Sequence, residues 1–590
     1  MSFEIAYVLA LLVVALVLFA WDVLGVDVVG AIVLLLLAIP GVLTPEEALG
    51  GFGSETAVVI GSLFVITAGI VRTGVVERLG LRLAALGRGN PNRLVRFILI
   101  AATSVSSFLS NTVTTAVFLP LAIGSAQRAR ISASRILMPL AFATILSGGV
   151  SLIATSTNLV VSGELPRYGL ERLGFFEMAP VGIPITILGM LYLLYVAPRL
   201  VPDRGGVDRL ESYDLRKYFS EVIVTEGSPL AGKSLGESHL GSSLDLNVVG
   251  IVRGEKRILA PSPSTALEEG DILLIEGRAD GILLVKDAVG VEIRAEFKLS
   301  DKALVSDRVR MVEAMVLPRS SLVGRTLREA RFREKTGLAV LAIHSAGGPD
   351  ILDKLSRRRL RSGDVLLLQG SIENVKRLRQ DDLLPLEDVS SHHPRSPRGR
   401  LAAAIFVATV IAGITGVVAL PIAFLAGAVA MILARCITTE EAYKAIDWRL
   451  LVLIASMMAF GRAMEKTGAA EWVANVFLGV LAPFGENAIL AGILLLTIAL
   501  TQPMSNQAAA LVVLPIAVRI ANEINVSPRP LVVAVALAAS CSFLTPLEPA
   551  SVLVYGPGRY RFFDFVKVGG LLTVIVFVMA MALIPIVWPM

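Results

Sequence analysis

Two stretches of the chain place many hydroxyl and amide side chains inside apolar sequence. Residues 103–115 are rich in Ser and Thr around Asn111, and residues 147–158 run from a Gly-Gly pair to Thr-Ser-Thr-Asn. In hydrocarbon, an unsatisfied backbone group costs several kcal/mol, so such a break is tolerated only where it is buried in protein or lines a cavity. Unwound carbonyls, amide oxygens and hydroxyls suit a small cation, and the half-helix that follows a break can receive an anion at its N-terminus. The two stretches therefore predict ion-binding chemistry.

A structural role is the alternative for the same residues, because hydroxyls can bond to helix carbonyls and glycines can serve close packing. Neither break holds a His, a Cys or paired carboxylates placed for catalysis, so an enzyme and a catalytic cofactor are not expected. The two cysteines and four histidines also form no pattern typical of a disulfide framework or a zinc site.

Composition predicts the elements that hold these breaks. The chain has 590 residues, of which 55% are hydrophobic and 17% charged, and its mean hydropathy is +0.73. These values exclude a wholly soluble protein and a disordered chain, and indicate a polytopic α-helical membrane protein surrounded by lipid. The net charge of +5 is spread over loops and a central polar segment, so no nucleic-acid partner is expected.

Apolar runs near the length of a bilayer span fill residues 1–204 and 400–590. The first 20 residues are interpreted as a retained span, because they lack the basic start and small-residue cleavage site of a signal peptide. In the first block, spans are expected at 5–23, 26–43, 56–72, 135–162 and 178–199, with a broken segment at 95–128. In the second block, they are expected at 401–417, 419–435, 448–464, 530–555 and 566–588, with a broken segment at 488–520.

The two blocks match each other at a nearly constant offset. The residues 44–48 (Thr-Pro-Glu-Glu-Ala) recur as 438–442 (Thr-Thr-Glu-Glu-Ala), and Thr73-Gly74 recurs as Thr467-Gly468, both 394 residues later. Ser110-Asn111 recurs as Ser505-Asn506, 395 residues later. These matches predict two repeats, each with five spans and a re-entrant helical hairpin. Five crossings in each make the repeats inverted.

Arg-rich loops surround the first broken segment and join the last two predicted spans, which places those loops in the cytoplasm. The loop at 44–55 and the region 465–486 are poor in Arg and Lys and are expected outside. Both termini then lie outside, and residues 205–398 are cytoplasmic. The predicted location is the cytoplasmic (inner) membrane.

The central segment is itself duplicated. Residues 230–235 recur as 322–327, and Gly270-Asp271 recurs as Gly363-Asp364, each before a short apolar run. Short β-rich runs between polar turns predict two α+β domains, at 205–300 and 301–386. A linker rich in Ser, Pro, His and Arg follows at 387–399.

The membrane motifs resemble the divalent anion/sodium symporter family. The resemblance is carried by Ser110-Asn111-Thr112, by Gly148-Gly149 leading to residues 155–158, and by Thr545-Pro546 with the 554–558 segment Val-Tyr-Gly-Pro-Gly. The central domains resemble tandem TrkA-C (RCK C-terminal) modules. The resemblance implies an inverted-repeat fold, a small divalent anion (sulfate or a di- or tricarboxylate) as substrate, Na⁺ as coupling ion, a homodimer, and a regulatory nucleotide such as cyclic di-AMP on the modules.

The resemblance also implies which residues bind. The substrate-binding positions are Ser110, Asn111, Thr112, Thr157, Asn158, Ser505, Asn506, Thr545 and Pro546. A first Na⁺ site would use Ser110, Asn111, Gly149, Thr155 and Asn158, with Ser156 beside them. A second would use Ser505, Asn506, Glu548 and Ser551.

The second half-site departs from the family pattern. Gln507 replaces a Thr, and residues 547–551 (Leu-Glu-Pro-Ala-Ser) replace a Gly followed by a Thr-Asn pair, in a break one residue shorter. An ionisable residue at a membrane break is a functional hypothesis by default. Glu548 either supplies a charged ligand or exchanges a proton, since desolvation favours its neutral form; the alternative is a carboxylate in a solvated loop or paired with an arginine.

The function predicted from these patterns is secondary active transport of a small divalent anion, coupled to Na⁺ or H⁺ by alternating access and regulated by the TrkA-C modules. A ligand-gated ion channel and a non-transporting membrane sensor are the alternatives. The hydroxyls, amides and helix N-termini suit sulfate and dicarboxylates alike, so the sequence does not name the anion.

Overall fold

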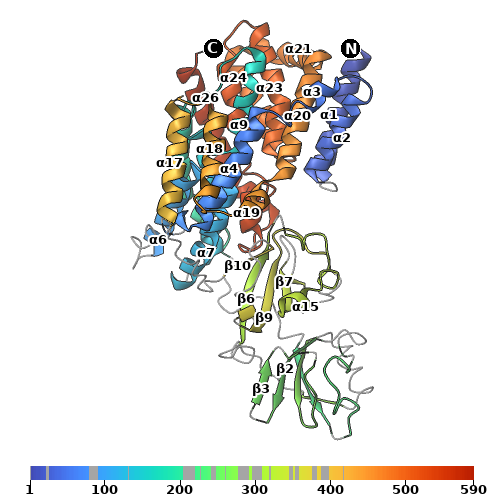
Figure 1. Ribbon diagram of the computed structural model, residues 1–590. Coiled ribbons are helices and arrows are strands. Elements are labelled where there is room, and N and C mark those ends of the chain that lie inside the picture. The colour runs from blue at the N-terminus through green and yellow to red at the C-terminus, as the bar shows by residue number, and fades with distance from the viewer. Residues whose placement is uncertain are drawn as a thin grey trace.

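The computed structural model divides into a helical part and a smaller strand-rich part, as Figure 1 shows. Outside the central segment it describes residues 2–21, 25–76, 78, 91–129, 132–203, 398–415 and 417–589. Within the central segment it describes 219–225, 227–238, 240, 247–254, 256–259, 261–262, 264–276, 291–294, 309–317, 320–344, 350–351, 358–371, 373–374 and 382–386. The predicted linker 387–399 lies outside the described residues except for its last two.

The first block follows the predicted spans, with one of them interrupted. Its helices are α1 Phe3–Trp21, α2 Val26–Ala38, α3 Pro45–Leu49, α4 Glu55–Arg72, α6 Pro91–Ser106, α7 Asn111–Ala129, α8 Ser134–Leu146, α9 Ser156–Glu164, α10 Ala179–Tyr195 and α11 Ala197–Leu200. The span expected at 135–162 is two helices, α8 and α9, because the polar break between them leaves the α-helical path after a 3₁₀ turn at Ser147–Gly149. The arginines at 93 and 96, expected in a loop, belong to α6.

The second block repeats this order. Its helices are α17 Gly399–Thr415, α18 Leu420–Leu433, α19 Thr439–Ala445, α20 Trp448–Lys466, α21 Ala469–Leu481, α22 Glu486–Thr501, α23 Asn506–Glu523, α24 Arg529–Ala539, α25 Pro549–Tyr555 and α26 Phe562–Val587. The span expected at 530–555 is again split, into α24 and α25. The region 465–486, to which the hydropathy pattern assigned no span, contains the amphipathic helix α21.

The matched sequence motifs have the same local structure. The side chain of Thr44 caps α3 and Glu47 returns the hydrogen bond, while Thr438 and Glu441 form the same capping box on α19. Gly74 and Gly468 both end a helix with φ near +70° and +79°, where a side chain would be strained. Figure 1 shows α3 at the end of the helical part far from the strands and α19 at the end beside them. Equivalent elements thus lie at opposite ends, the arrangement that inverted repeats require.

The two blocks interlock by exchanging equivalent contacts. Helix α2 packs on α20, and its counterpart α18 packs on α4, the counterpart of α20. Two ion pairs also join equivalent positions of opposite blocks. Arg72 pairs with Glu441, and Lys466 Nζ pairs with Glu47 Oε2 at 2.7 Å. Each pair joins the last turn of one long helix to the capping box of the other block.

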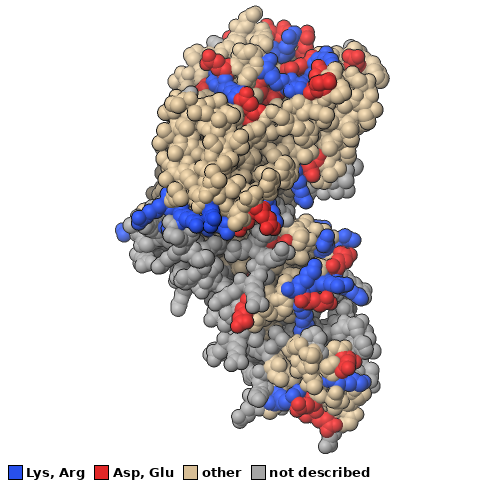
Figure 2. Space-filling view, in the orientation of Figure 1, with Lys and Arg blue, Asp and Glu red and all other residues tan. Residues whose placement is uncertain are grey.

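The helical part has a membrane-like surface. Figure 2 shows a broad band without charged side chains, with Lys, Arg, Asp and Glu gathered at its two ends. Among the described helices, α4 and α26 are long and apolar enough to cross a membrane alone, and α20 with the following residues to Phe484 makes a third if their 72° bend lies within one span. Other apolar helices have 10 to 17 residues. Five crossings in each block therefore stay a prediction.

The central segment contains two copies of one sheet. The first sheet has the order β3-β2-β4-β1-β5 and the second β10-β6-β9-β7-β8, which is the same order once each strand is replaced by its counterpart. The strands are β1 Phe219–Val224, β2 Asn247–Arg253, β3 Lys256–Leu259, β4 Ile272–Glu276, β5 Val291–Arg294, β6 Val309–Val316, β7 Ala339–His344, β8 Asp350–Ile351, β9 Val365–Ser371 and β10 Leu383–Pro385. All pairings are antiparallel, and β2 and β7 carry a bulge at the same position. The short helix α15, Phe332–Thr336, belongs to the second copy.

The second sheet contacts the helical part directly. Met315 and Val365 belong to the same buried cluster as the helices. A Cβ built on Gly556, just after α25, would overlap the carbonyl oxygen of Gly363. This contact joins the strand-rich part to the loop that follows the second break.

Candidate functional site

The tip of the first hairpin lies between α6 and α7, and the first break is the polar segment between α8 and α9. Hydrogen bonds join the two. Ser106 Oγ, at the end of α6, donates to the Thr144 carbonyl oxygen in α8 at 3.0 Å and lies 3.2 Å from Asn111 Oδ1. Ser151 Oγ donates to the Ser107 carbonyl oxygen. The hairpin tip therefore presents Asn111 at the start of α7 with its amide held in place.

The tip of the second hairpin, between α22 and α23, is hydrogen-bonded in the same way to the second break, between α24 and α25. Thr501 Oγ1 donates to the Ala539 carbonyl oxygen at 2.8 Å and lies 2.8 Å from Asn506 Oδ1. Thr501, Ala539 and Asn506 lie 395 residues after Ser106, Thr144 and Asn111, respectively. Ser542 Oγ lies 3.1 Å from Asn506 Oδ1, so two hydroxyl groups are within hydrogen-bond distance of this amide oxygen.

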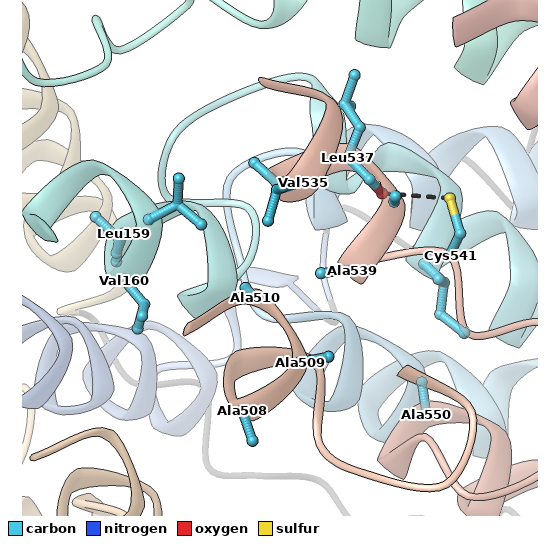
Figure 3. Close-up of a cluster of buried hydrophobic side chains, with 14 of the residues drawn as sticks. Leu159, Val160, Ala508, Ala509, Ala510, Val535, Leu537, Ala539, Cys541 and Ala550 are labelled. Atoms are coloured by element: carbon cyan, nitrogen blue, oxygen red, sulfur yellow. Dashed lines mark hydrogen bonds between the residues drawn. The ribbon is translucent and has the colours of Figure 1, made fainter. Parts of the chain in front are cut away.

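Small side chains allow the broken helices to approach each other. Figure 3 shows residues 508–510, three alanines of α23, in one buried cluster with Leu159 and Val160 of α9 and with the end of α24. The alanines are fully buried. In the same cluster, Cys541 Sγ contacts the Leu537 carbonyl oxygen at 3.2 Å, so this buried thiol contributes to packing.

The glycines of the first break also serve close packing. Gly149, predicted as a Na⁺ ligand, lies against Gly182 of α10, where a Cβ would overlap the Gly149 carbonyl oxygen. The Gly148 carbonyl oxygen accepts a bond from Asn158 Nδ2 at 2.8 Å, and Asn158 Nδ2 also reaches the Ser151 carbonyl oxygen at 3.1 Å. The Asn158 amide group thus closes the break, and its Oδ1 is left for another partner.

Each break ends at the N-cap of a half-helix, and the two caps differ. Thr155 caps α9 through a bond from Thr157 N to its Oγ1 at 2.9 Å. Glu548 caps α25, and its Oε2 accepts bonds from Ala550 N at 2.6 Å and Ser551 N at 3.3 Å. Glu548 is only 8% exposed, so the solvated-loop interpretation is wrong.

The two breaks differ from each other in length. Thr144 and Ala539 occupy equivalent positions 395 residues apart, whereas the caps Thr155 and Glu548 are 393 apart. The second break is therefore two residues shorter than the first. At the cap-based offset, Asn158 corresponds to Ser551.

The half-helices α9 and α25, which follow the two breaks, each contact the hairpin of the other repeat. Gln507 Nε2, at the second tip, donates to Ser156 Oγ at 2.7 Å, and α9 packs on α23. In the reciprocal arrangement, α25 packs on α7 and α8, and the Asn111 side chain interacts with the Glu548 carboxylate. Glu548, predicted to join Ser505 and Asn506, thus contacts the tip of the first hairpin.

Several buried oxygens at the tips and breaks lack a hydrogen-bond partner among the described residues. Each of them lies at a hairpin tip or in the first turn of the helix that follows a tip or a break. They are Thr114 Oγ1, Thr157 Oγ1, Asn158 Oδ1, Gln502 Oε1 and Ser551 Oγ. Buried polar atoms are normally paired. Hydroxyl and amide oxygens left unpaired here fit a small cation or a polar ligand, which is what the predicted cation sites require.

The remaining predicted residues lie at the two hairpin tips and in the second break. Ser110 and Thr112 flank Asn111, and Ser505 caps α23; all three are half-buried. Thr545 Oγ1 donates to the Gln502 carbonyl oxygen at 3.3 Å, and Pro546 is buried beside it.

Sequence reasoning missed the residues that fasten the tips. Thr144, Thr501, Gln502 and Ser542 were not selected, although each extends the polar clusters. Extending the 395-residue offset beyond Asn111 and Asn506 would have found Thr501, which stands where Ser106 stands in the first repeat.

The chain is similar in sequence to known membrane transporters. Residues 16–538 match the model of the citrate transporter family. An uncharacterized transporter of Synechocystis sp. is 33% identical over 97% of this chain and 95% of its own length. An uncharacterized transporter of Escherichia coli is 32% identical over the whole of both chains. Sodium/sulfate cotransporter 2 of Chlamydomonas reinhardtii is 29% identical over 61% of this chain and 42% of its own length.

Among solved structures, the GsuK RCK domain is 14% identical over 28% of this chain and 64% of its own, with a TM-score of 0.15. At that score the likeness supports no conclusion about the strand-rich part. The family match, which spans most of the chain, agrees with the resemblance drawn from the motifs. The chain is therefore a multi-pass membrane transporter that belongs to the citrate transporter family.

Proposed function

We propose that this chain is a secondary active carrier of a small divalent anion, sulfate or a di- or tricarboxylate, driven by Na⁺. The observation that carries the proposal is the reciprocal contact of tips and breaks, Gln507 with Ser156 and Asn111 with Glu548. Unpaired buried oxygens occur within a few residues of both contacts in the sequence. A site made jointly by two repeats is what alternating access needs, because movement of one repeat against the other changes its exposure.

The substrate would lie between the two tips, bound by Asn111 and Asn158 on one side and Asn506 and Thr545 on the other. The first Na⁺ would use the unpaired Asn158 Oδ1 with the carbonyls of the first break. The second would use the Glu548 carboxylate and Ser551 Oγ. Both cations are cargo, and no covalent chemistry is involved.

The strand-rich part is proposed to regulate transport. Its second sheet touches the loop after α25, so a ligand that binds one transport state better than the other would shift activity by that difference. A cytoplasmic nucleotide is the proposed ligand of the tandem TrkA-C modules, and a homodimer is the proposed assembly. Both termini lie at the end opposite the strands in Figure 1, which supports a cytoplasmic position for residues 205–398.

Proteoliposomes test the transport proposal. Labelled sulfate, succinate, malate, citrate and phosphate are offered with and without an inward Na⁺ gradient. A carrier shows saturable, Na⁺-dependent uptake of one anion and faster uptake of label when preloaded with unlabelled substrate. Current without counterflow would indicate a channel instead, and neither signal would reject transport of these anions.

A further inference from the structure

The two half-sites carry different charges. Residues 103–115, 147–158, 501–507 and 540–551 make up both tips and both breaks, and Glu548 is the one charged residue among them. At the equivalent cap, Thr155 is neutral. The site therefore has one polar half and one half with a fixed carboxylate.

An anion in this site must be held without a basic side chain, since those stretches contain no Lys, Arg or His. Its partners are hydroxyls, amides and the N–H groups of the breaks. At the second break, two N–H groups are already bonded by Glu548 Oε2, at 2.6 Å and 3.3 Å. A substrate carboxylate brought there would meet a carboxylate in place of free donors.

Helices α7 and α8, which pack on α25, place no basic residue of their sequence at the end where Glu548 lies. Helix α7 carries a single arginine, in its last turn, whereas the site is at its first turn. Helix α8 carries Arg135 in its first turn, whereas the break follows its last. A Na⁺ bound at Glu548 would be neutralised by it and would offer no net positive charge to a second anionic group.

We infer that Glu548 is a specificity-determining residue that acts as a built-in anion in the second half-site. The carrier accordingly takes a compact oxyanion of the sulfate type, whose charge sits on one centre beside Asn158 and Thr157. It excludes linear dicarboxylates, which would place their second carboxylate beside Glu548. Like-charge juxtaposition in a buried site is a strong device for rejecting the wrong ligand. This inference rests on the proposed function and narrows its substrate class.

Competition against labelled sulfate uptake by the full-length protein tests the inference. For the wild type, succinate should inhibit half-maximally at a concentration about tenfold or more above that of unlabelled sulfate, as like-charge repulsion of the second carboxylate requires. Glu548→Ser keeps an N-cap oxygen and removes the carboxylate, so the gap should close. Glu548→Asp keeps the charge and should retain the exclusion.

Equal inhibition by sulfate and succinate in the wild type would overturn the inference, as would an unchanged gap in Glu548→Ser. Glu548→Gln, which keeps the shape and removes the charge, replaces the Ser variant if that variant does not fold. Thermal stabilisation of the purified wild type by sulfate and by succinate measures selectivity without transport. Stabilisation by both anions alike rejects the inference, whereas sulfate-selective stabilisation without uptake rejects the transport proposal and leaves the selectivity standing.

Discussion

Gln507 and Ser156 are 351 residues apart in the chain, and Gln507 Nε2 donates to Ser156 Oγ at 2.7 Å. The bond joins the tip of the second hairpin to the first break, so the proposed site is shared by the two repeats. Breaking it should loosen the site without unfolding the helices.

Gln507→Ala should therefore raise the half-saturating substrate concentration several-fold, in line with about 1 kcal/mol for a net hydrogen bond. Gln507→Asn shortens the side chain and should behave in the same way. Uptake rates across substrate concentrations measure the effect, with Asn475→Ala on the exposed side of α21 as the control. Wild-type kinetics in both Gln507 variants would place this residue outside the site.

Asn111 and Asn158 are the amides of the first half-site. Replacing either with Ala should abolish or greatly weaken transport, because the first removes the contact to Glu548 and the second removes an unpaired oxygen together with two bonds that close the break. Uptake into proteoliposomes and the amount of folded protein are measured together. Near-normal uptake by both variants would reject their assignment.

Glu548→Gln should change the sodium or pH dependence of sulfate uptake more than the apparent affinity for sulfate. Gln keeps the shape and the cap but removes the charge that a cation or proton would neutralise. Uptake is measured from about pH 5 to about pH 9 at several sodium concentrations. Curves that superimpose on those of the wild type would remove Glu548 from the coupling site.

Gly556 is the point at which the helical part meets the second sheet. Gly556→Leu would drive a side chain into the Gly363 carbonyl and should alter the rate of uptake or its response to cytoplasmic nucleotides. Gly479→Leu is the matched control, since a Cβ there meets open space. If neither Gly556→Leu nor deletion of residues 210–385 changes transport or its response, the regulatory role is rejected.

The two exchanged ion pairs give a prediction about stability. Glu441→Gln should lower the free energy of unfolding by about 1 kcal/mol or less, and Glu47→Gln should also have only a small effect, because all four side chains are between about one third and one half exposed. The double variant should be the sum of the two, since the pairs do not share a residue. Thermal unfolding in detergent measures this, and a loss several times larger would mean that the pairs hold the repeats together.

The sequence by itself determined the helices, the breaks and the repeat. Apolar runs, caps such as Thr44 and turn glycines such as Gly468 act within a few residues, so a linear pattern predicts them. It also predicted that the breaks bind ions, because Ser, Thr and Asn in apolar sequence must find partners. The same local signals predicted short strands in the central segment.

Only the tertiary structure decided which break meets which tip. Glu548 was expected beside Asn506, its neighbour within the repeat, yet α25 packs on α7 and brings it to Asn111. The second break is two residues shorter, and its cap is a carboxylate that binds its own helix start. A linear pattern could not decide this, because the partner of a half-helix depends on which small-residue surfaces pack together, and those surfaces lie hundreds of residues apart in the chain.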